Sequence, residues 1–143
     1  MLFRSIFEKI IAREIPASIV YEDDLVIAFL DITQATKGHT LVVTKTAYPD
    51  LFSVPQDVLS HLFIVVQKLA GAIKVAFEAK GINILNNNGE TAGQTVFHYH
   101  VHILPRYEKN DIDLHFKNHM NELTKEDYQE RLQTIKKVLN QNV

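Results

Sequence analysis

The stretch GQTVFHYHVHILPRY, residues 93–107, decides the fold of this sequence, because its centre alternates strictly between histidines and apolar residues. Successive side chains of a β-strand point to opposite faces, so the pattern predicts three imidazoles on one face of a sheet and an apolar surface on the other. We expect the apolar face to pack and the histidine face to look outward. The histidines are His98, His100 and His102, and the apolar residues are Tyr99, Val101 and Ile103.

Four more strands are predicted upstream. SIVYEDDLVIAFLDI, residues 18–32, contains two β-rich runs around an acidic turn at 22–24, which is typical of a hairpin. HTLVVTK, residues 39–45, predicts a third strand. INILN, residues 82–86, predicts a fourth, and an Asn/Gly-rich loop joins it to the fifth strand, VFHYHVHIL, at 96–104.

Two helices are predicted before the histidine strand. The N-terminal segment has apolar residues at helical spacing until Pro16 ends it, which indicates a short helix. Ser53 and Gln56 have the spacing of a capping box ahead of a long apolar stripe, and Gly81 is its expected terminator. This stripe predicts the long core helix of the protein.

A last helix is predicted near the C-terminus, where Thr124 and Asp127 have capping-box spacing. The order of elements predicts an α+β fold: a mainly antiparallel five-stranded sheet with a long core helix, a short N-terminal helix and a C-terminal helix. The length fits one domain, residues 1–143. We expect its core at about 3–107 and a C-terminal helical extension at about 108–143.

Composition excludes several classes of protein. The 15 Lys and Arg residues nearly balance 17 Asp and Glu residues, so the chain has no global basic field for a nucleic acid polymer. The absence of cysteine excludes disulfides, thiol nucleophiles and thiolate metal sites. The N-terminus is interrupted by charges and matches neither a signal peptide nor a membrane span, so we expect a cytoplasmic protein without a membrane partner.

The histidine row itself favours a phosphate over a metal ion. At roughly 3.3 Å per residue the outer two histidines of a regular strand are about 13 Å apart, too far for all three to bind one ion. Two of them could do so, and a metal-dependent hydrolase built on a His-x-His pair therefore stays open. A row of imidazoles suits a larger anion, which one ring attacks while its neighbours donate hydrogen bonds.

The loop before the histidine strand is compatible with phosphate binding. It contains small or amide-bearing residues that let backbone N–H groups and neutral donors approach phosphate oxygens. Taken alone, an Asn/Gly-rich segment is more often an ordinary hairpin connection, and its position beside three histidines weakens that interpretation. The residues are Asn87, Gly89, Gly93, Gln94 and Thr95.

These residues resemble the histidine triad (HIT) superfamily, whose signature is His-φ-His-φ-His-φ-φ with φ apolar. HYHVHIL, residues 98–104, fits it, with Tyr99 in an apolar position. The similarity runs through the predicted hairpin, third strand and Asn/Gly-rich loop, and it weakens after Tyr107. The chain is most similar to the Hint branch, which implies a homodimer that hydrolyses purine nucleoside phosphoramidates or related nucleotidyl adducts to the nucleoside monophosphate, without a cofactor.

The resemblance implies roles for four histidines. His100 corresponds to the nucleophile, which attacks the α-phosphorus and forms a transient nucleotidyl-histidine. His102 corresponds to the residue that contacts phosphate oxygens and assists the leaving group, and His98 to the one that orients the site. His39, in KGHTLVV, matches a fourth histidine that the family keeps near the nucleophile.

The resemblance also implies a substrate pocket. Asp31 corresponds to a carboxylate that binds both ribose hydroxyls, although from its position alone it could also cap a strand end. Thr95 corresponds to a hydroxyl that contacts the phosphate or leaving group. The other phosphate-side residues are Asn87, Gly93, Gln94 and the backbone of Val96. The residues implied around the base, which the apolar pattern alone would place in the core, are Ile6, Phe7, Ile10, Ile32 and Leu41.

One departure from the family concerns zinc. Many bacterial relatives bind a structural zinc through a C-x-x-C pair, a histidine after the third strand and a triad histidine. The corresponding residues here are Ser5, Glu8 and Ala47, so we expect a fold without metal.

Other interpretations remain for the sequence. A complete triad indicates catalytic competence, but the protein could be a nucleotide-binding or interaction module with little physiological catalysis. The remaining histidines are predicted to lie outside any site: His61 falls in the core helix, and the pair His115 and His119 has helical metal-ligand spacing but no third ligand nearby.

Overall fold

The computed structural model describes residues 4–141, which divide into two compact units. The first unit ends at Ile112 and contains the sheet, and the second begins at Asp113. Whether the second unit is an extension of a single domain stays a prediction.

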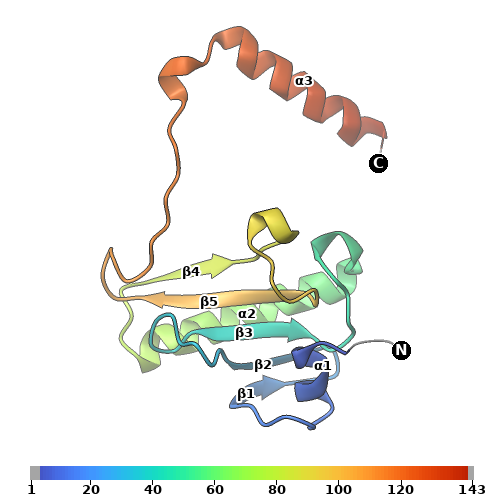
Figure 1. The fold of residues 1–143 in the computed structure, drawn as a ribbon, viewed down its shortest axis with the longest axis vertical. Coiled ribbons are helices and arrows are strands. Elements are labelled where there is room, and N and C mark those ends of the chain that lie inside the picture. Colours follow the sequence, from blue (N-terminus) through green and yellow to red (C-terminus); the bar gives the residue numbers. More distant parts are fainter. Residues whose placement is uncertain (1–3, 142–143) are drawn as a thin grey trace. The chain divides into compact units, whose positions relative to one another are not determined.

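The first unit is built on one antiparallel sheet with strand order β1-β2-β3-β5-β4. Figure 1 shows β5 between β3 and β4, so the histidine strand has a strand neighbour on both sides. Together with three helices this sheet confirms the predicted α+β fold. The strands are β1 (Ile19–Glu22), β2 (Val26–Leu30), β3 (Thr40–Thr44), β4 (Gly81–Leu85) and β5 (His100–Arg106).

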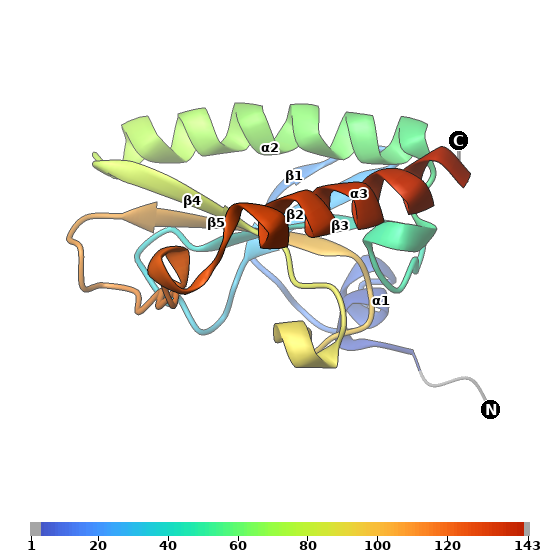
Figure 2. The same ribbon diagram turned by 90° about the horizontal axis from the view of Figure 1, so that it is seen from above.

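Both faces of the sheet are covered by helices. The long helix α2 (Gln56–Ala76) lies along one face, and the short helix α1 (Ile6–Ile11) lies on the other (Figure 2). Strands β2 and β3 therefore have apolar residues on both faces and are buried almost throughout. The α2 face contains Val26, Ala28, Val42, Leu62, Val65, Val66, Tyr99, Val101 and Ile103, and the α1 face contains Phe7, Ile10, Ile27, Phe29, Leu41 and Val43.

Helix α2 is long and apolar enough to cross a membrane by length and composition alone. Exposed apolar residues such as Phe63, Ile64 and Val75 contribute to this composition, together with five buried side chains that pack against the sheet. These side chains are Val58, Leu62, Val65, Val66 and Ile73.

Two predicted boundaries of α2 are wrong. Ser53 does not cap the helix: Pro55 occupies the N-cap position, and the Ser53 hydroxyl donates to the Asp50 carbonyl in a short 3₁₀ turn, Leu51–Ser53. At the other end Gly81 begins β4, and the helix has already ended at Ala76. The chain reverses just after the helix through Glu78, whose φ of 54° is in the left-handed region.

The start of the histidine strand also differs from the prediction. The ladder of β5 begins at His100, so residues 96–99 approach the sheet as irregular chain. The alternation of side chains nevertheless persists, since Tyr99 joins the α2 face with Val101. The Tyr99 N–H donates to the Tyr48 carbonyl instead of to a strand neighbour.

The second unit is helical. Helix α3 (Lys125–Gln141) begins at the predicted capping box, in which the Asp127 carboxylate accepts from the Thr124 N–H and the Thr124 hydroxyl accepts from the Asp127 N–H. Its apolar side chains, including Leu132 and Ile135, are exposed.

Candidate active site

A cavity of about 270 Å³ opens on the α1 face of the sheet, at the ends of the histidine strand and the Asn/Gly-rich loop. It brings together residues from α1, from the β2 end, from β3, from the loop and from β5. They are Ile6, Phe7, Asp31, Ile32, Leu41, Asn87, Gly93, Thr95, Val96, His100 and His102.

The histidine row does not look outward as expected. His98 is fully buried and His100 is 7% exposed, because α1 covers them. The Phe7 ring contacts both imidazoles edge-on, with centroid distances of 5.8 Å to His98 and 4.9 Å to His100. Only His102 is partly exposed. The side chains do alternate as predicted, but the polar face of β5 is enclosed by a helix.

His100 is held in a form suited to nucleophilic attack. Its Nδ1 lies 2.7 Å from the His98 carbonyl, which can only accept, so we assign the proton to Nδ1. Nε2 then carries a free lone pair on a ring that lines the cavity. Burial lowers the pKa of His100, which keeps the ring neutral near pH 7.

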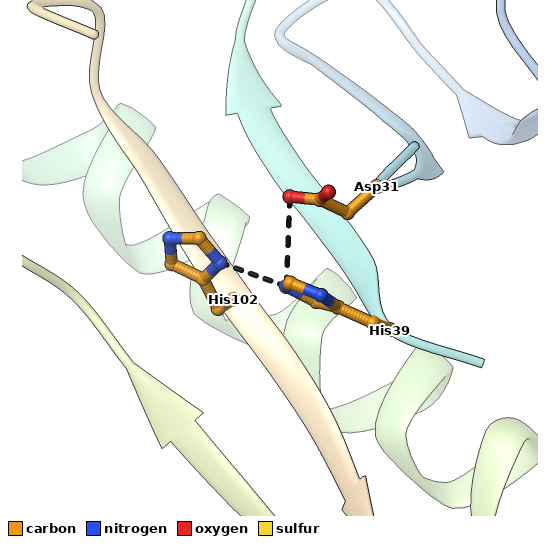
Figure 3. A group of neighbouring side chains, drawn as sticks. All are labelled: Asp31, His39 and His102. Atoms are coloured by element: carbon orange, nitrogen blue, oxygen red, sulfur yellow. Dashed lines mark hydrogen bonds and ion pairs between the residues drawn. The ribbon is translucent and has the colours of Figure 1, made fainter. Parts of the chain in front are cut away.

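His102 is oriented by His39 behind it. The Ala35 N–H donates to His39 Nδ1 at 3.3 Å, so neutral His39 carries its proton on Nε2. That Nε2 lies 2.9 Å from His102 Nδ1, which must accept, and the proton of His102 is thereby placed on its own Nε2 (Figure 3). The chain of bonds supplies the cavity with an N–H donor beside the His100 lone pair.

Burial dominates the acid–base properties of this pair. It lowers the pKa of His39, and it lowers that of His102 to about 4 with help from the neighbouring His100 and His39. Both rings are therefore neutral at pH 7, consistent with the assigned tautomers.

Asp31 leaves one carboxylate oxygen free at the end of β2. Its Oδ1 accepts from the Thr33 N–H at 2.8 Å and from the Thr33 hydroxyl at 2.6 Å. Burial raises the pKa of Asp31, but these hydrogen bonds outweigh it and hold the pKa below its usual value. Oδ2 lies 3.7 Å from His39 Nε2 and borders the cavity, where it can accept from a ligand hydroxyl (Figure 3).

Asp31, His39 and His102 bring potential ligand atoms within 4.8 Å of one another, which is a spacing that a metal ion could use. The hydrogen bonds disfavour one. A metal on His39 Nε2 requires a proton on Nδ1, and that proton would face the Ala35 N–H.

The positions equivalent to a zinc site do not fit zinc either. The Ser5 hydroxyl lies 3.4 Å from His98 Nδ1, and the Glu8 carboxylate accepts from the Ser5 N–H as part of the α1 capping box. Ala47 has no ligand atom. His98 Nε2 is 2.5 Å from the Thr44 carbonyl, so Nδ1 is the acceptor of the Ser5 hydroxyl. Here a hydrogen bond joins α1 to the triad.

Two asparagine amides of the loop are structural, and one between them is free for a ligand. Asn86 donates to the His100 carbonyl, and Asn88 donates to Asn86 while accepting from the Leu51 N–H. Asn87, between them, turns its amide toward the cavity. A Cβ at Gly93 would make only an ordinary contact of 3.6 Å with that amide, so it is the φ of 94° of Gly93 that favours glycine here.

Gln94 has a different place from the one expected. Its carboxamide accepts from the Gly89 N–H at 2.8 Å and donates to the Pro49 carbonyl at 2.7 Å and to the Val96 carbonyl at 3.1 Å. It is buried and lies outside the cavity lining. Gln94 therefore shapes the loop from behind, whereas Thr95 and the Val96 segment face the cavity.

An apolar hollow of about 480 Å³ adjoins the cavity. The two share Ile6, Asp31 and Ile32, and the hollow adds Ile10 and Phe29. Ile10 is thus in the hollow and not in the cavity, and Ile32 is 99% exposed at the border of both. A flat apolar group attached to a polar one could occupy the two spaces together.

The structure brings most of the predicted site residues to the cavity, with His98, His39 and Gln94 in supporting positions behind it. Sequence reasoning missed Thr33, Gln34 and Ala35, which act through hydrogen bonds to Asp31 and His39. The only feature of the sequence that could have indicated them is their position between Asp31 and His39.

Comparison with known proteins gives the family. A HIT domain model matches residues 12–109. Protein hit of Bacillus subtilis is 50% identical over 135 residues, covering 94% of this chain and 93% of that protein. Adenylylsulfatase HINT3 of Arabidopsis thaliana is 39% identical over 105 residues, covering 73% of this chain and 53% of that protein.

Solved structures share the fold. The crystal structure of a HIT family protein from Bacillus anthracis has a TM-score of 0.90 at 50% identity, over 96% of this chain and 99% of that one. A histidine triad nucleotide-binding protein from Candida albicans has a TM-score of 0.85 at 31% identity, over 98% of this chain and 100% of that one.

Proposed function

The chain belongs to the HIT domain family, and from that membership we propose that it is a nucleotide-binding hydrolase. The specific activity proposed is cleavage of purine nucleoside phosphoramidates, or related nucleotidyl adducts, to the nucleoside monophosphate through a nucleotidyl-histidine. The similar proteins named adenylylsulfatase and nucleotide-binding protein support the broader activity. The observation that carries the finer one is the fixed Nδ1 proton of His100, which leaves Nε2 free beside the His102 donor.

The cavity and hollow together accommodate the parts of a nucleotide. The apolar hollow with Ile10 and Phe29 suits a purine base, which packs well against flat or branched apolar side chains. Asp31 Oδ2 is placed to accept from ribose hydroxyls at the junction of the two spaces. The phosphate then lies near Asn87 and Thr95, within reach of the histidines.

In the first step of the proposed reaction, His100 Nε2 forms a bond to the α-phosphorus. The bond from phosphorus to the leaving nitrogen breaks, and that nitrogen keeps the electron pair and departs with a proton from water. The Nδ1–H bond to the His98 carbonyl stabilises the positive charge on the substituted ring. The N–H of His102 donates to a phosphoryl oxygen as charge develops there.

In the second step water attacks the phosphorus and gives up a proton, which neutralises the hydroxide left by the first step. The bond to His100 breaks, its electron pair returns to Nε2, and the nucleoside monophosphate is released. Water is thus divided between the monophosphate and the amine. Asn87, Thr95 and backbone N–H groups of the loop hold the phosphate oxygens during both steps.

The test is hydrolysis of adenosine 5′-phosphoramidate with EDTA present, followed by mass spectrometry of acid-quenched protein. We expect turnover and an adenylylated peptide containing His100, and neither product in His100→Ala. The matched control is His115→Ala, which removes an exposed histidine of the second unit. Loss of turnover on adding EDTA would contradict the proposal and favour a metal-dependent reaction. Binding of AMP without any turnover would favour a nucleotide-binding module.

We also propose that the protein is a homodimer formed through α2 and β4. Strand β4 is at the end of the sheet, so within residues 4–141 one of its edges has no strand neighbour. Beside it, Phe63, Ile64 and Ile84 are exposed around a groove of about 610 Å³. Light scattering should give twice the chain mass, and Ile64→Glu should shift the mass toward one chain. Val75→Glu, an exposed position farther along α2, is the control, and a parent protein of one chain mass would contradict the proposal.

A further inference from the structure

Gln34 lies in the loop that joins β2 to β3 and has an uncommon backbone conformation. Its φ of 43° falls in the left-handed region, which glycine and asparagine adopt far more readily than glutamine. Such a conformation is unfavourable for an ordinary residue, because Cβ comes too close to a backbone carbonyl oxygen. A glutamine at this position therefore needs a compensating interaction.

The compensation comes from the side chain. Its Nε2 donates to the Asp31 carbonyl at 2.7 Å and to the His39 carbonyl at 2.8 Å, and its Oε1 accepts from the Gly38 N–H at 2.9 Å. Both N–H groups and the oxygen of one carboxamide are thus used, although the residue as a whole is exposed.

These bonds join the two ends of the loop at the residues that serve the cavity. The Asp31 N–H also donates to the His39 carbonyl, at 3.0 Å, so that carbonyl accepts from both the backbone and Gln34. The loop begins with the free Oδ2 of Asp31 and ends with the His39 ring that fixes the His102 tautomer. One carboxamide thereby sets the distance between the ribose acceptor and the proton-bearing pair.

We infer that Gln34 is a positioning residue, a role that rests on the proposed function: its carboxamide holds Asp31 for the ribose and His39 for His102. Gln34 does not line the cavity that contains His100 and His102, although it borders the adjoining apolar hollow. Its effect passes through the backbones of Asp31 and His39. Thr33 and Ala35 act beside it, one on the Asp31 carboxylate and the other on His39 Nδ1.

Two variants of Gln34 distinguish the loss of its carboxamide from the effects of an added charge and of a strained backbone. Gln34→Glu keeps the shape and the acceptor for the Gly38 N–H, but it places an oxygen against two carbonyls that need a donor. Gln34→Gly adopts the left-handed backbone easily and removes the carboxamide. A loss of activity or of AMP affinity that both variants share is therefore due to the lost carboxamide. Gln133→Glu, on exposed α3, makes the same change of charge away from the site and is the matched control.

The experiment combines kinetics, AMP binding and the imidazole ¹⁵N spectra of the intact protein. In both Gln34 variants we expect kcat/KM for adenosine 5′-phosphoramidate to fall by about 10²-fold, since loss of alignment has effects of that order. The fall should include a higher KM and weaker AMP binding, because Asp31 is displaced and because Gln34 borders the hollow proposed for the base. The ¹⁵N spectra should show that His39 and His102 change from one tautomer each to a mixture.

The outcomes distinguish this inference from the proposed function. Unchanged tautomers and unchanged AMP affinity in both Gln34 variants would overturn it. A lower melting temperature with the same KM and the same ¹⁵N spectra would also overturn it, because it would show a role in stability alone. A parent protein without turnover would contradict the proposed function, while the tautomers, which need no substrate, would still decide the role of Gln34.

Discussion

The two faces of the sheet are formed by alternate residues of the same strands and are buried to similar degrees, but their chemistry differs. On the α2 face, Tyr99, Val101 and Ile103 fill space against an apolar helix. On the α1 face the alternate residues His98 and His100 are as buried, yet each ring nitrogen that points away from the cavity has a defined hydrogen-bond partner. Burial therefore does not distinguish core from site in this protein. The distinction lies in which polar atoms are left without a partner and where they point.

The largest expected effect comes from making the α1 face resemble the α2 face. His100→Leu removes the nucleophile and fills its place with an apolar side chain. We expect turnover to fall on the order of 10⁴-fold or more, because a covalent route depends on the attacking group. Urea unfolding should show a change in stability of no more than about 1 kcal/mol, since the apolar side chain gains from burial beside Phe7 while the His98 carbonyl loses its donor. A large drop in stability would mean that the triad is needed for the fold itself.

A substitution on the α2 face should instead lower stability and leave catalysis unchanged. Leu62 is completely buried in α2, so Leu62→Ala leaves a cavity in the core. We expect the free energy of unfolding to fall by about 3 kcal/mol. Per folded molecule, kcat/KM should stay as in the parent. The control is Leu132→Ala on exposed α3. Reduced kcat/KM in folded Leu62→Ala would show that the two faces are coupled.

The histidine face should make the fold sensitive to acid, which the apolar face cannot do. His102 titrates at about 4 in the folded chain against an ordinary value of 6.5. Between these values the unfolded chain binds more protons, so stability is present at pH 7 and is lost as pH falls from about 6.5 toward 4. We expect a loss of about 2 kcal/mol at pH 5 from this residue. Urea unfolding at several pH values measures it, and His102→Gln should flatten the slope. An equal slope in that variant would contradict the assignment.

The smallest expected effect tests whether the α2 face tolerates a polar atom. The Tyr99 hydroxyl is buried and has no hydrogen-bond partner within the described chain. Tyr99→Phe removes it with the ring unchanged, and we expect stability to rise by about 1 kcal/mol. Thermal unfolding is the measurement, with Tyr128→Phe on the exposed surface of α3 as the control. A loss of stability would show that the hydroxyl has a partner such as a buried water.

The sequence predicts the elements of this fold well, because their periodicities are local. The 3.6-residue stripe of α2 and the two-residue alternation before Arg106 are independent of distant parts of the chain. The outward orientation of the histidines was predicted wrongly because it depends on contacts between distant parts of the chain. Whether a polar face is open or covered depends on where α1 docks, and the contact of Phe7 with His100 joins residues far apart in sequence. The boundaries at Ser53 and Gly81 failed because a neighbouring 3₁₀ turn and strand used those residues instead.

The part of the site that lies within the alternating histidine motif could be predicted from the sequence. The alternation places His98, His100 and His102 together without any family knowledge, whereas the proximity of His39 came from the resemblance alone. The roles assigned to these residues stay predictions. Gln34 could not be found from sequence, because its importance lies in bonds to backbone carbonyls, which any residue possesses and no side-chain pattern reveals.

Helix α1 has only six residues, too few for a helix to persist by itself in water. It therefore keeps its form through its capping box and through the docking of Phe7 and Ile10 on the sheet. Detachment of this one turn and a half is the smallest local opening that would uncover His98 and His100. A bound nucleotide touching Ile6 and Phe7 would oppose that opening, so amide hydrogen exchange in α1 should slow when the site is filled and report its occupancy.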